Sequence, residues 1–151
     1  MGPETAIIGW GDGLAGDADA GGAVIESLER WRPPVWARLI TVRDADSFDP
    51  NRVADAAEIY VVASIAAEGG GEVRVWKADE INQEVVPAAV ERICSRLAEA
   101  GVPAERVICV GVEAPGFSPG DGMSADVAEG VLEATHLIVR RMSLRALASA
   151  A

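Results

Sequence analysis

The residues with the clearest chemical potential stand near the start of the chain, in a loop rich in glycine and aspartate. Residues 11–16 read Gly-Asp-Gly-Leu-Ala-Gly and satisfy the G-x-G-x-x-G pattern of dinucleotide-binding turns, in which backbone N–H groups hold a pyrophosphate. The pattern begins two residues after Gly9, however, and Asp12, Asp17 and Asp19 crowd the phosphate position without a nearby Lys or Arg. A structural glycine turn is therefore favoured, and a nucleotide-binding or small-molecule-binding module is the weaker alternative.

Carboxylates and one tryptophan dominate the loops in which chemistry is expected. Six residues form the candidate cleft: Trp10, Asp12, Asp17, Asp19, Asp44 and Glu113. Oxygen donors of this kind suit Mg²⁺ or Ca²⁺, whereas nickel favours sites that contain nitrogen. The simpler interpretation, which we favour, is that these carboxylates cap helices and solvate loops. Trp10 could close the cleft or stack on a partner, but packing beneath the loop is the favoured role.

The sequence contains no arrangement that would activate a nucleophile. Three serines stand in predicted loops: Ser64, Ser118 and Ser124. The one histidine, His136, follows Ser124 by twelve residues in the last predicted helix, which places it roughly 18 Å along that helix. Cys94 and Cys109 are expected inside a helix and a strand, as buried thiols that are not bonded to each other. We therefore assign no catalytic residue and no metal site.

Apolar periodicity indicates which elements position these loops. Strands are expected over residues 5–9, 36–42, 59–64, 72–77 and 106–112, the third buried at the centre of a sheet and the fourth at an antiparallel edge. Helices are expected over residues 19–31, 49–58 and 87–100 and from Ser124 onward. This alternation predicts an α/β fold, a three-layer α/β/α sandwich with a mostly parallel sheet of about five strands. In such sheets, functional sites lie beyond the carboxyl ends of the strands.

The last predicted helix carries a stripe of residues that we expect to be buried. The stripe comprises Val127, Val131, Leu132, Thr135, Ile138, Val139 and Met142. The alanine-rich tail over residues 146–151 is expected to fray.

Length, charge and composition exclude several classes of protein. The 151 residues, of which 50% are hydrophobic, fit a single domain over residues 1–151. The 13 basic and 24 acidic residues give a net charge of −11, which argues against binding to nucleic acid or to a membrane surface. No apolar run reaches the ~18 residues of a membrane span. The N-terminus lacks the pattern of a signal peptide and there are only two cysteines, so we expect a cytoplasmic protein.

Four segments, in order along the chain, resemble the motifs of the hydrogenase maturation endopeptidases. In the opening motif, five residues fall in register with the family: Gly9, Gly11, Leu14, Asp17 and Gly21. Residues 57–64 resemble the family's central strand, residues 107–115 a later strand and its Glu-Ala-Pro end, and residues 122–124 the start of the final helix. The resemblance covers residues 6–142 and implies the fold of that family.

The resemblance also implies a metal contact that this sequence lacks. In the family, a nickel ion of the immature hydrogenase large subunit is met by an acidic residue, an aspartate and a histidine. The first two positions correspond here to Ala18 and Ala63, and residues 80–84, where the histidine would be, contain none. Because the nickel belongs to the substrate in this family, we expect no cofactor of the chain's own.

Two functional hypotheses follow from this resemblance. In the favoured one, the chain is a degenerate member of the family without nickel-dependent peptidase activity, and it binds a protein partner of the type of a hydrogenase large subunit as a chaperone or assembly factor. In the alternative, it is an active endopeptidase that trims the C-terminus of such a subunit with displaced acidic ligands such as Asp17 or Asp19. The sequence leaves open whether the chain is an enzyme.

Overall fold

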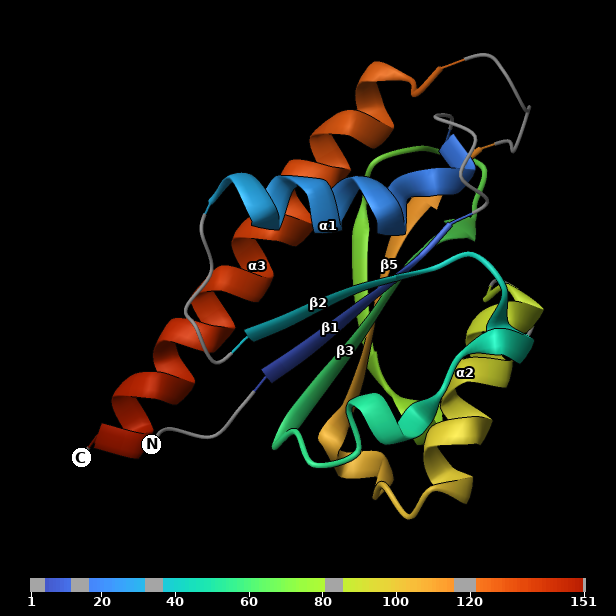
Figure 1. Ribbon diagram of the computed structural model, residues 1–151. Coiled ribbons are helices and arrows are strands. Elements are labelled where there is room, and N and C mark those ends of the chain that lie inside the picture. Colours follow the sequence, from blue (N-terminus) through green and yellow to red (C-terminus); the bar gives the residue numbers. More distant parts are fainter. Residues whose placement is uncertain (1–4, 12–16, 32–36, 81–85, 116–121, 151) are drawn as a thin grey trace.

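The computed structural model describes residues 5–11, 17–31, 37–80, 86–115 and 122–150, which build one five-stranded sheet with helices on both faces (Figure 1). Across the sheet, the strands are β2 (Ala37–Val42), β1 (Thr5–Trp10), β3 (Glu58–Ala66), β5 (Val107–Ala114) and β4 (Val73–Lys77). Neighbouring strands are parallel except that β4 pairs with β5 in the antiparallel direction. The mostly parallel sheet and its antiparallel edge are thus confirmed.

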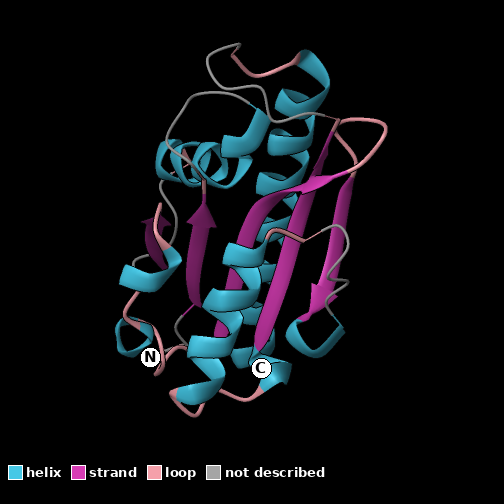
Figure 2. Cartoon of the chain, turned by 90° about the vertical axis from the view of Figure 1, so that its right-hand side faces the viewer, coloured by secondary structure: helices cyan, strands magenta, loops and turns pink. Residues whose placement is uncertain are grey.

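Three α-helices supply the outer layers of the sandwich. α1 (Ala20–Arg30) and α3 (Ala125–Ala150) cover one face of the sheet, and α2 (Ala88–Glu99) covers the other (Figures 1 and 2). A separate apolar core lies on each side of the sheet, and short turns over residues 45–56 help α2 to close its side. The three-layer α/β/α architecture is confirmed. No helix in the described ranges combines the length and the apolarity that a bilayer span requires.

The burial of the central strand β3 on both faces explains why its sequence is apolar without interruption. Ile59, Tyr60, Val61 and Val62 are at most 1% exposed. Alternate side chains enter the two cores, with Ile59 and Val61 on the α2 side and Tyr60 and Val62 on the side of α1 and α3. A strand covered on both faces has no solvent side, so apolar residues occupy both alternations.

The segment over residues 49–58 is not the helix that the sequence predicts. Asp49 does act as a cap, since its carboxylate accepts a hydrogen bond from the backbone N–H of Asn51 at 3.0 Å, but only the 3₁₀ turn η3 (Pro50–Arg52) follows. The chain then turns again, with a hydrogen bond from the N–H of Ala56 to the carbonyl of Val53, and β3 begins at Glu58. Pairing of Glu58 with Thr5 on β1 requires an extended backbone there, so a helix cannot run to residue 58.

The last helix differs from its prediction in two respects. Its helical hydrogen bonding continues to Ala150, whereas we expected fraying from residue 146. Leu132 is 53% exposed, and Ala134 is fully buried in its place. Leu132 lies about 100° around the helix from the buried Val131 and therefore leaves the sheet-facing side. The other buried stripe positions face the core that α3 shares with α1.

Candidate functional site

The glycines of the opening motif let α1 press its first turn against the ends of two strands. A Cβ atom added to Gly21 would lie 2.3 Å from the carbonyl oxygens of both Trp10 and Val62. A Cβ on Gly9 would lie 2.3 Å from the carbonyl oxygen of Gly21. No side chain fits at these distances, so both glycines are required by close backbone approach. The start of α1 is thereby placed at the carboxyl edge of the sheet.

Ser64 and Asp19 hold the start of α1. The Oγ of Ser64, which is 1% exposed, accepts a hydrogen bond from the backbone N–H of Ala20 at 3.2 Å. The Oδ1 of Asp19 lies 2.7 Å from the position of a Cβ on Gly22, and a Cβ on Gly11 would overlap it. Ser64 therefore lies inside β3, which runs two residues beyond the strand expected over residues 59–64, and its side chain caps a helix instead of facing a loop. Its polar side chain is buried because it has this partner.

Two of the sequence-predicted cleft residues cannot be placed at the site. Asp12 lies outside the described residues. The backbone of Asp17 begins the 3₁₀ turn η1 (Asp17–Asp19), but its side chain is not among those described.

The two alanines at the positions for which the resemblance implies acidic residues lie on elements that are in contact. Ala18 is in the middle of η1 and is half-buried, while Ala63 lies near the carboxyl end of β3 and is 3% exposed. η1 contacts β3 directly. A methyl group has no lone pair to offer a metal. Across the part of the chain that the structure describes, no group of three or more His, Cys, Asp or Glu side chains could hold a metal ion.

Trp10 is the last residue of β1 and packs against the core on the α2 side, to which Ala63 also belongs. The ring is therefore part of the wall beneath the site. Its Nε1 is buried and finds no hydrogen-bond acceptor among the described residues. A buried donor without an acceptor is costly and uncommon in folded proteins.

Glu113 and Arg74 form the charged feature of this edge. The sequence predicts a loop at Glu113. The residue is instead the penultimate one of β5, and it is 8% exposed. Its Oε1 accepts a hydrogen bond from Nε of Arg74 at 2.6 Å. The pair lines a pocket of about 380 Å³ whose other walls are residues 65–69. Strand β5 runs this far because the N–H of Glu113 bonds the carbonyl of Glu72 at 2.8 Å.

Sequence reasoning missed Arg74, although a signal for it existed. The alternation over residues 72–77 places Arg74 and Trp76 on the same face of β4. Trp76 packs on the α2-side core, so Arg74 lies on that side too. Pairing of Arg74 with Gly111 in the antiparallel register then brings its side chain to Glu113.

Asp44 and His136 are engaged elsewhere. The Asp44 carboxylate accepts hydrogen bonds from the Ser47 hydroxyl at 2.7 Å and from the Asp46 N–H at 3.0 Å, capping the turn η2 (Ala45–Ser47). These two bonds hold the pKa of Asp44 below its usual value. His136 is exposed on α3, where its ring meets Trp31 edge-on with centroids 5.1 Å apart. The lone histidine thus does not join the carboxyl edge.

The comparisons with known proteins agree with this architecture. No family model matches the sequence, and no curated protein matches it. Among solved structures, the NiFe hydrogenase maturation protease HybD from Thermococcus kodakarensis is 18% identical, with a TM-score of 0.70 over 91% of this chain and 98% of that one. The hydrogenase maturating endopeptidase HybD from Escherichia coli is 15% identical, with a TM-score of 0.72 over 93% and 92%.

A third neighbour extends the likeness to another protein of this kind. The NiFe hydrogenase maturation protease HycI from Thermococcus kodakarensis is 17% identical, with a TM-score of 0.71 and 91% of each chain covered. The likeness runs over nearly the whole of every chain compared, in agreement with the order of the sequence motifs. The chain therefore has the fold of the hydrogenase maturation proteases.

Proposed function

We propose that this chain is a relative of the hydrogenase maturation proteases that binds a protein partner without cleaving it. The observation that carries the proposal is the pair of alanines, Ala18 and Ala63, on contacting elements at the carboxyl edge, where the resemblance implies acidic metal contacts. The fold is retained at this edge while two of the expected donors are methyl groups. A partner of the type of a hydrogenase large subunit fits both facts.

Three carboxylates that the structure describes at this edge, those of Glu113, Asp44 and Asp19, are poor substitutes for the lost donors. Glu113 is paired with Arg74, so a cation would have to displace a guanidinium from a largely buried carboxylate. The Asp44 carboxylate caps its own turn with two hydrogen bonds. Asp19 packs between Gly11 and Gly22 at the start of α1. Each of these three carboxylates has a structural role that competes with metal binding.

The pocket beside Glu113 supports a binding role for the same edge. It combines the apolar wall of Ile65 and Ala66 with two carboxylates, those of Glu68 and Glu113, and the guanidinium of Arg74. Such a lining matches an extended polypeptide segment, which presents apolar side chains together with backbone donors and acceptors.

The test uses the purified, immature large subunit of a NiFe hydrogenase, loaded with nickel and carrying its C-terminal extension. Complex formation is followed by light scattering on a sizing column, and processing by the intact mass of the large subunit. We expect a complex and no loss of the extension. Cleavage would establish the active-endopeptidase alternative, and the absence of both complex and cleavage would refute the proposal.

A matched pair of variants tests whether the pocket is the binding surface. Ala66→Trp places a bulky ring at the exposed pocket wall, whereas Ala128→Trp makes the same change on the exposed side of α3. We expect Ala66→Trp to weaken the complex about tenfold or more, equivalent to about 1.4 kcal/mol, and Ala128→Trp to change affinity less than about twofold. Equal effects of the two changes would contradict the assignment of the surface.

A further inference from the structure

The two cysteines lie face to face between α2 and the sheet. Their Sγ atoms are 3.7 Å apart, and both are free thiols, which confirms that they are not bonded to each other. Their separation of 15 positions in the sequence did not suggest this contact. Cys109 lies on the α2-facing side of β5, together with Val61 of the neighbouring strand, and Cys94 lies on the sheet-facing side of α2.

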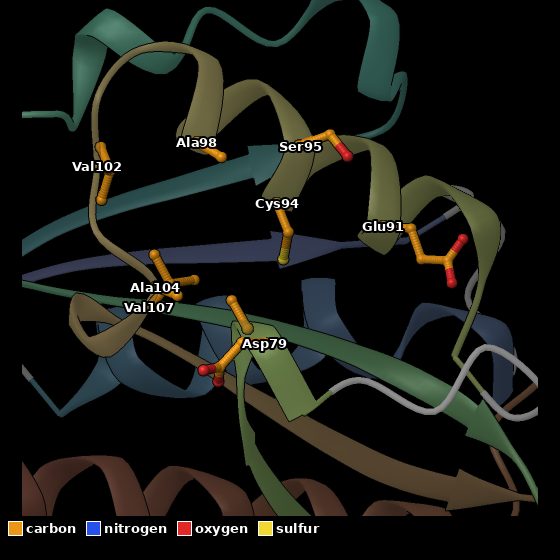
Figure 3. A pocket seen from close by; sticks show the side chains of 9 residues that line it. Asp79, Glu91, Cys94, Ser95, Ala98, Val102, Ala104 and Val107 are labelled. Carbon is orange, nitrogen blue, oxygen red and sulfur yellow. The ribbon is translucent and has the colours of Figure 1, made fainter.

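The surroundings distinguish one thiol from the other. Cys109 is 2% exposed, whereas Cys94 is half-buried and lines a pocket of about 450 Å³. The pocket lies between α2 and the turns η4 (Ala78–Glu80) and η5 (Ala104–Arg106) (Figure 3). In Figure 3 the sulfur of Cys94 points from the helix toward the sheet. A reagent in this pocket meets Cys94 first, with Cys109 behind it.

We propose that Cys94 and Cys109 form a redox-active dithiol that reacts with low-molecular-weight disulfides. The Cys94 thiolate attacks one sulfur of the small disulfide, forming a mixed disulfide and releasing one small thiol. The Cys109 thiolate then attacks Sγ of Cys94 and releases the second small thiol. Both protein thiols are oxidised, the small disulfide is reduced to two thiols, and the two protons pass to these products.

The distance and the electrostatics suit this order of events. A disulfide needs its sulfurs at about 2.05 Å, so the pair must close by roughly 1.7 Å. The hydrogen bond between the thiols lowers the pKa of Cys94, and this bond together with burial raises that of Cys109. The thiolate is the nucleophile, so Cys94 is the first to react. Burial and the charge of Glu91, one turn earlier on α2, act in the opposite sense on Cys94.

The pocket also indicates which small disulfides react best. Among the described residues, its lining contains two carboxylates, Asp79 and Glu91, and no lysine or arginine. The whole chain carries a net charge of −11. A cationic disulfide is therefore concentrated at Cys94, and an anionic one is repelled. The preferred reactant class is that of small cationic disulfides.

The experiment uses the reduced full-length chain with cystamine, a cationic disulfide, and with dithiodipropionate, an anionic disulfide of similar size. After an acid quench, thiols are alkylated under denaturing conditions and peptides are mapped by mass. We expect both thiols to disappear together, with the chain lighter by two hydrogen atoms and Cys94 linked to Cys109. At low salt, cystamine should react about tenfold faster than dithiodipropionate, and the ratio of the two rates should shrink as salt is added. Two thiols remaining after excess cystamine, or links only between chains, would overturn the proposal.

Two single variants separate the roles of the thiols. Cys109→Ser should stop the reaction at a mixed disulfide on Cys94, and Cys94→Ser should leave Cys109 at least about tenfold slower to react. If Cys109→Ser, which alters a buried residue, prevents folding, the reaction rate of Cys109 in Cys94→Ser alone tests the assigned order. Reaction of Cys109 at the rate of the native chain in that variant would contradict the assigned order. Glu91→Gln should reduce the preference for cystamine, and an unchanged preference would refute the role of the acidic pocket.

Discussion

Replacing Gly21 by alanine should loosen the contact on which the candidate site depends. The new Cβ would lie 2.3 Å from two carbonyl oxygens, on β1 and β3, and 2.7 Å from the N–H nitrogen of Trp10. Each oxygen is roughly 1 Å inside ordinary van der Waals contact, and all three obstacles are backbone atoms. Overpacking of this kind costs about 1–3 kcal/mol, or more where the backbone must move. Alanine in a helix offsets at most about 1 kcal/mol of this cost.

The neighbouring glycine provides the matched control. The three atoms nearest to a Cβ on Gly22 all belong to the carboxylate of Asp19, which is the end of a side chain and not backbone. Urea unfolding, followed by circular dichroism, should therefore show a lower midpoint for Gly21→Ala and a midpoint near that of the native chain for Gly22→Ala. If Gly21→Ala were as stable as Gly22→Ala, the close approach of α1 to the two strands would be refuted.

Three further outcomes are expected. Calorimetry should detect no Ni²⁺ binding by the native chain and at most weak binding after Ala18→Glu with Ala63→Asp, because a histidine is still absent; micromolar binding lost in Asp19→Ala would contradict this. The form with a Cys94–Cys109 disulfide closes a loop of 15 positions, so its free energy of unfolding in urea should exceed that of the reduced form by about 3 kcal/mol. Equal unfolding midpoints of the two forms would contradict this expectation. Asp44→Ala should destabilise the chain at neutral pH. Because the pKa of Asp44 is lowered in the folded state, that difference should shrink as the pH falls through the folded pKa, and a constant difference in acid denaturation curves would contradict the cap.

The elements could be predicted from the sequence because each strand and helix carries its own apolar period. β3 is the clearest case, since its unbroken apolar run requires cover on both faces. The short segment after Asp49 shows the limit of this reasoning. Its proline and capping carboxylate start one 3₁₀ turn, but the backbone must be extended by Glu58, which pairs with Thr5 on β1. Tertiary pairing prevailed over local preference.

The candidate site was less predictable because its polar residues obtain their partners from distant segments. Ser64 and Glu113 have polar side chains of the kind found in loops, yet both are buried in strands. Ser64 accepts a hydrogen bond from the N–H of Ala20, and Glu113 accepts one from Nε of Arg74. Neither partner can be identified without the strand order. The same holds for the cysteine pair, because a helix and a strand 15 positions apart meet only if α2 packs over β5. Local patterns carry no information on such contacts.

The strand order also determines when, during synthesis, each strand of the sheet can find its partners. β3 pairs with β1 on one side and with β5 on the other, and Ile59 meets Val107, which is 48 positions later. When β1, β2 and β3 have left the ribosome but β5 has not, the apolar strand β3 has one edge without a partner. Unpaired apolar edges are the sites at which chains associate wrongly. The edge of β3 that pairs with β5 is therefore most exposed to wrong association in the interval before residues 107–114 leave the ribosome.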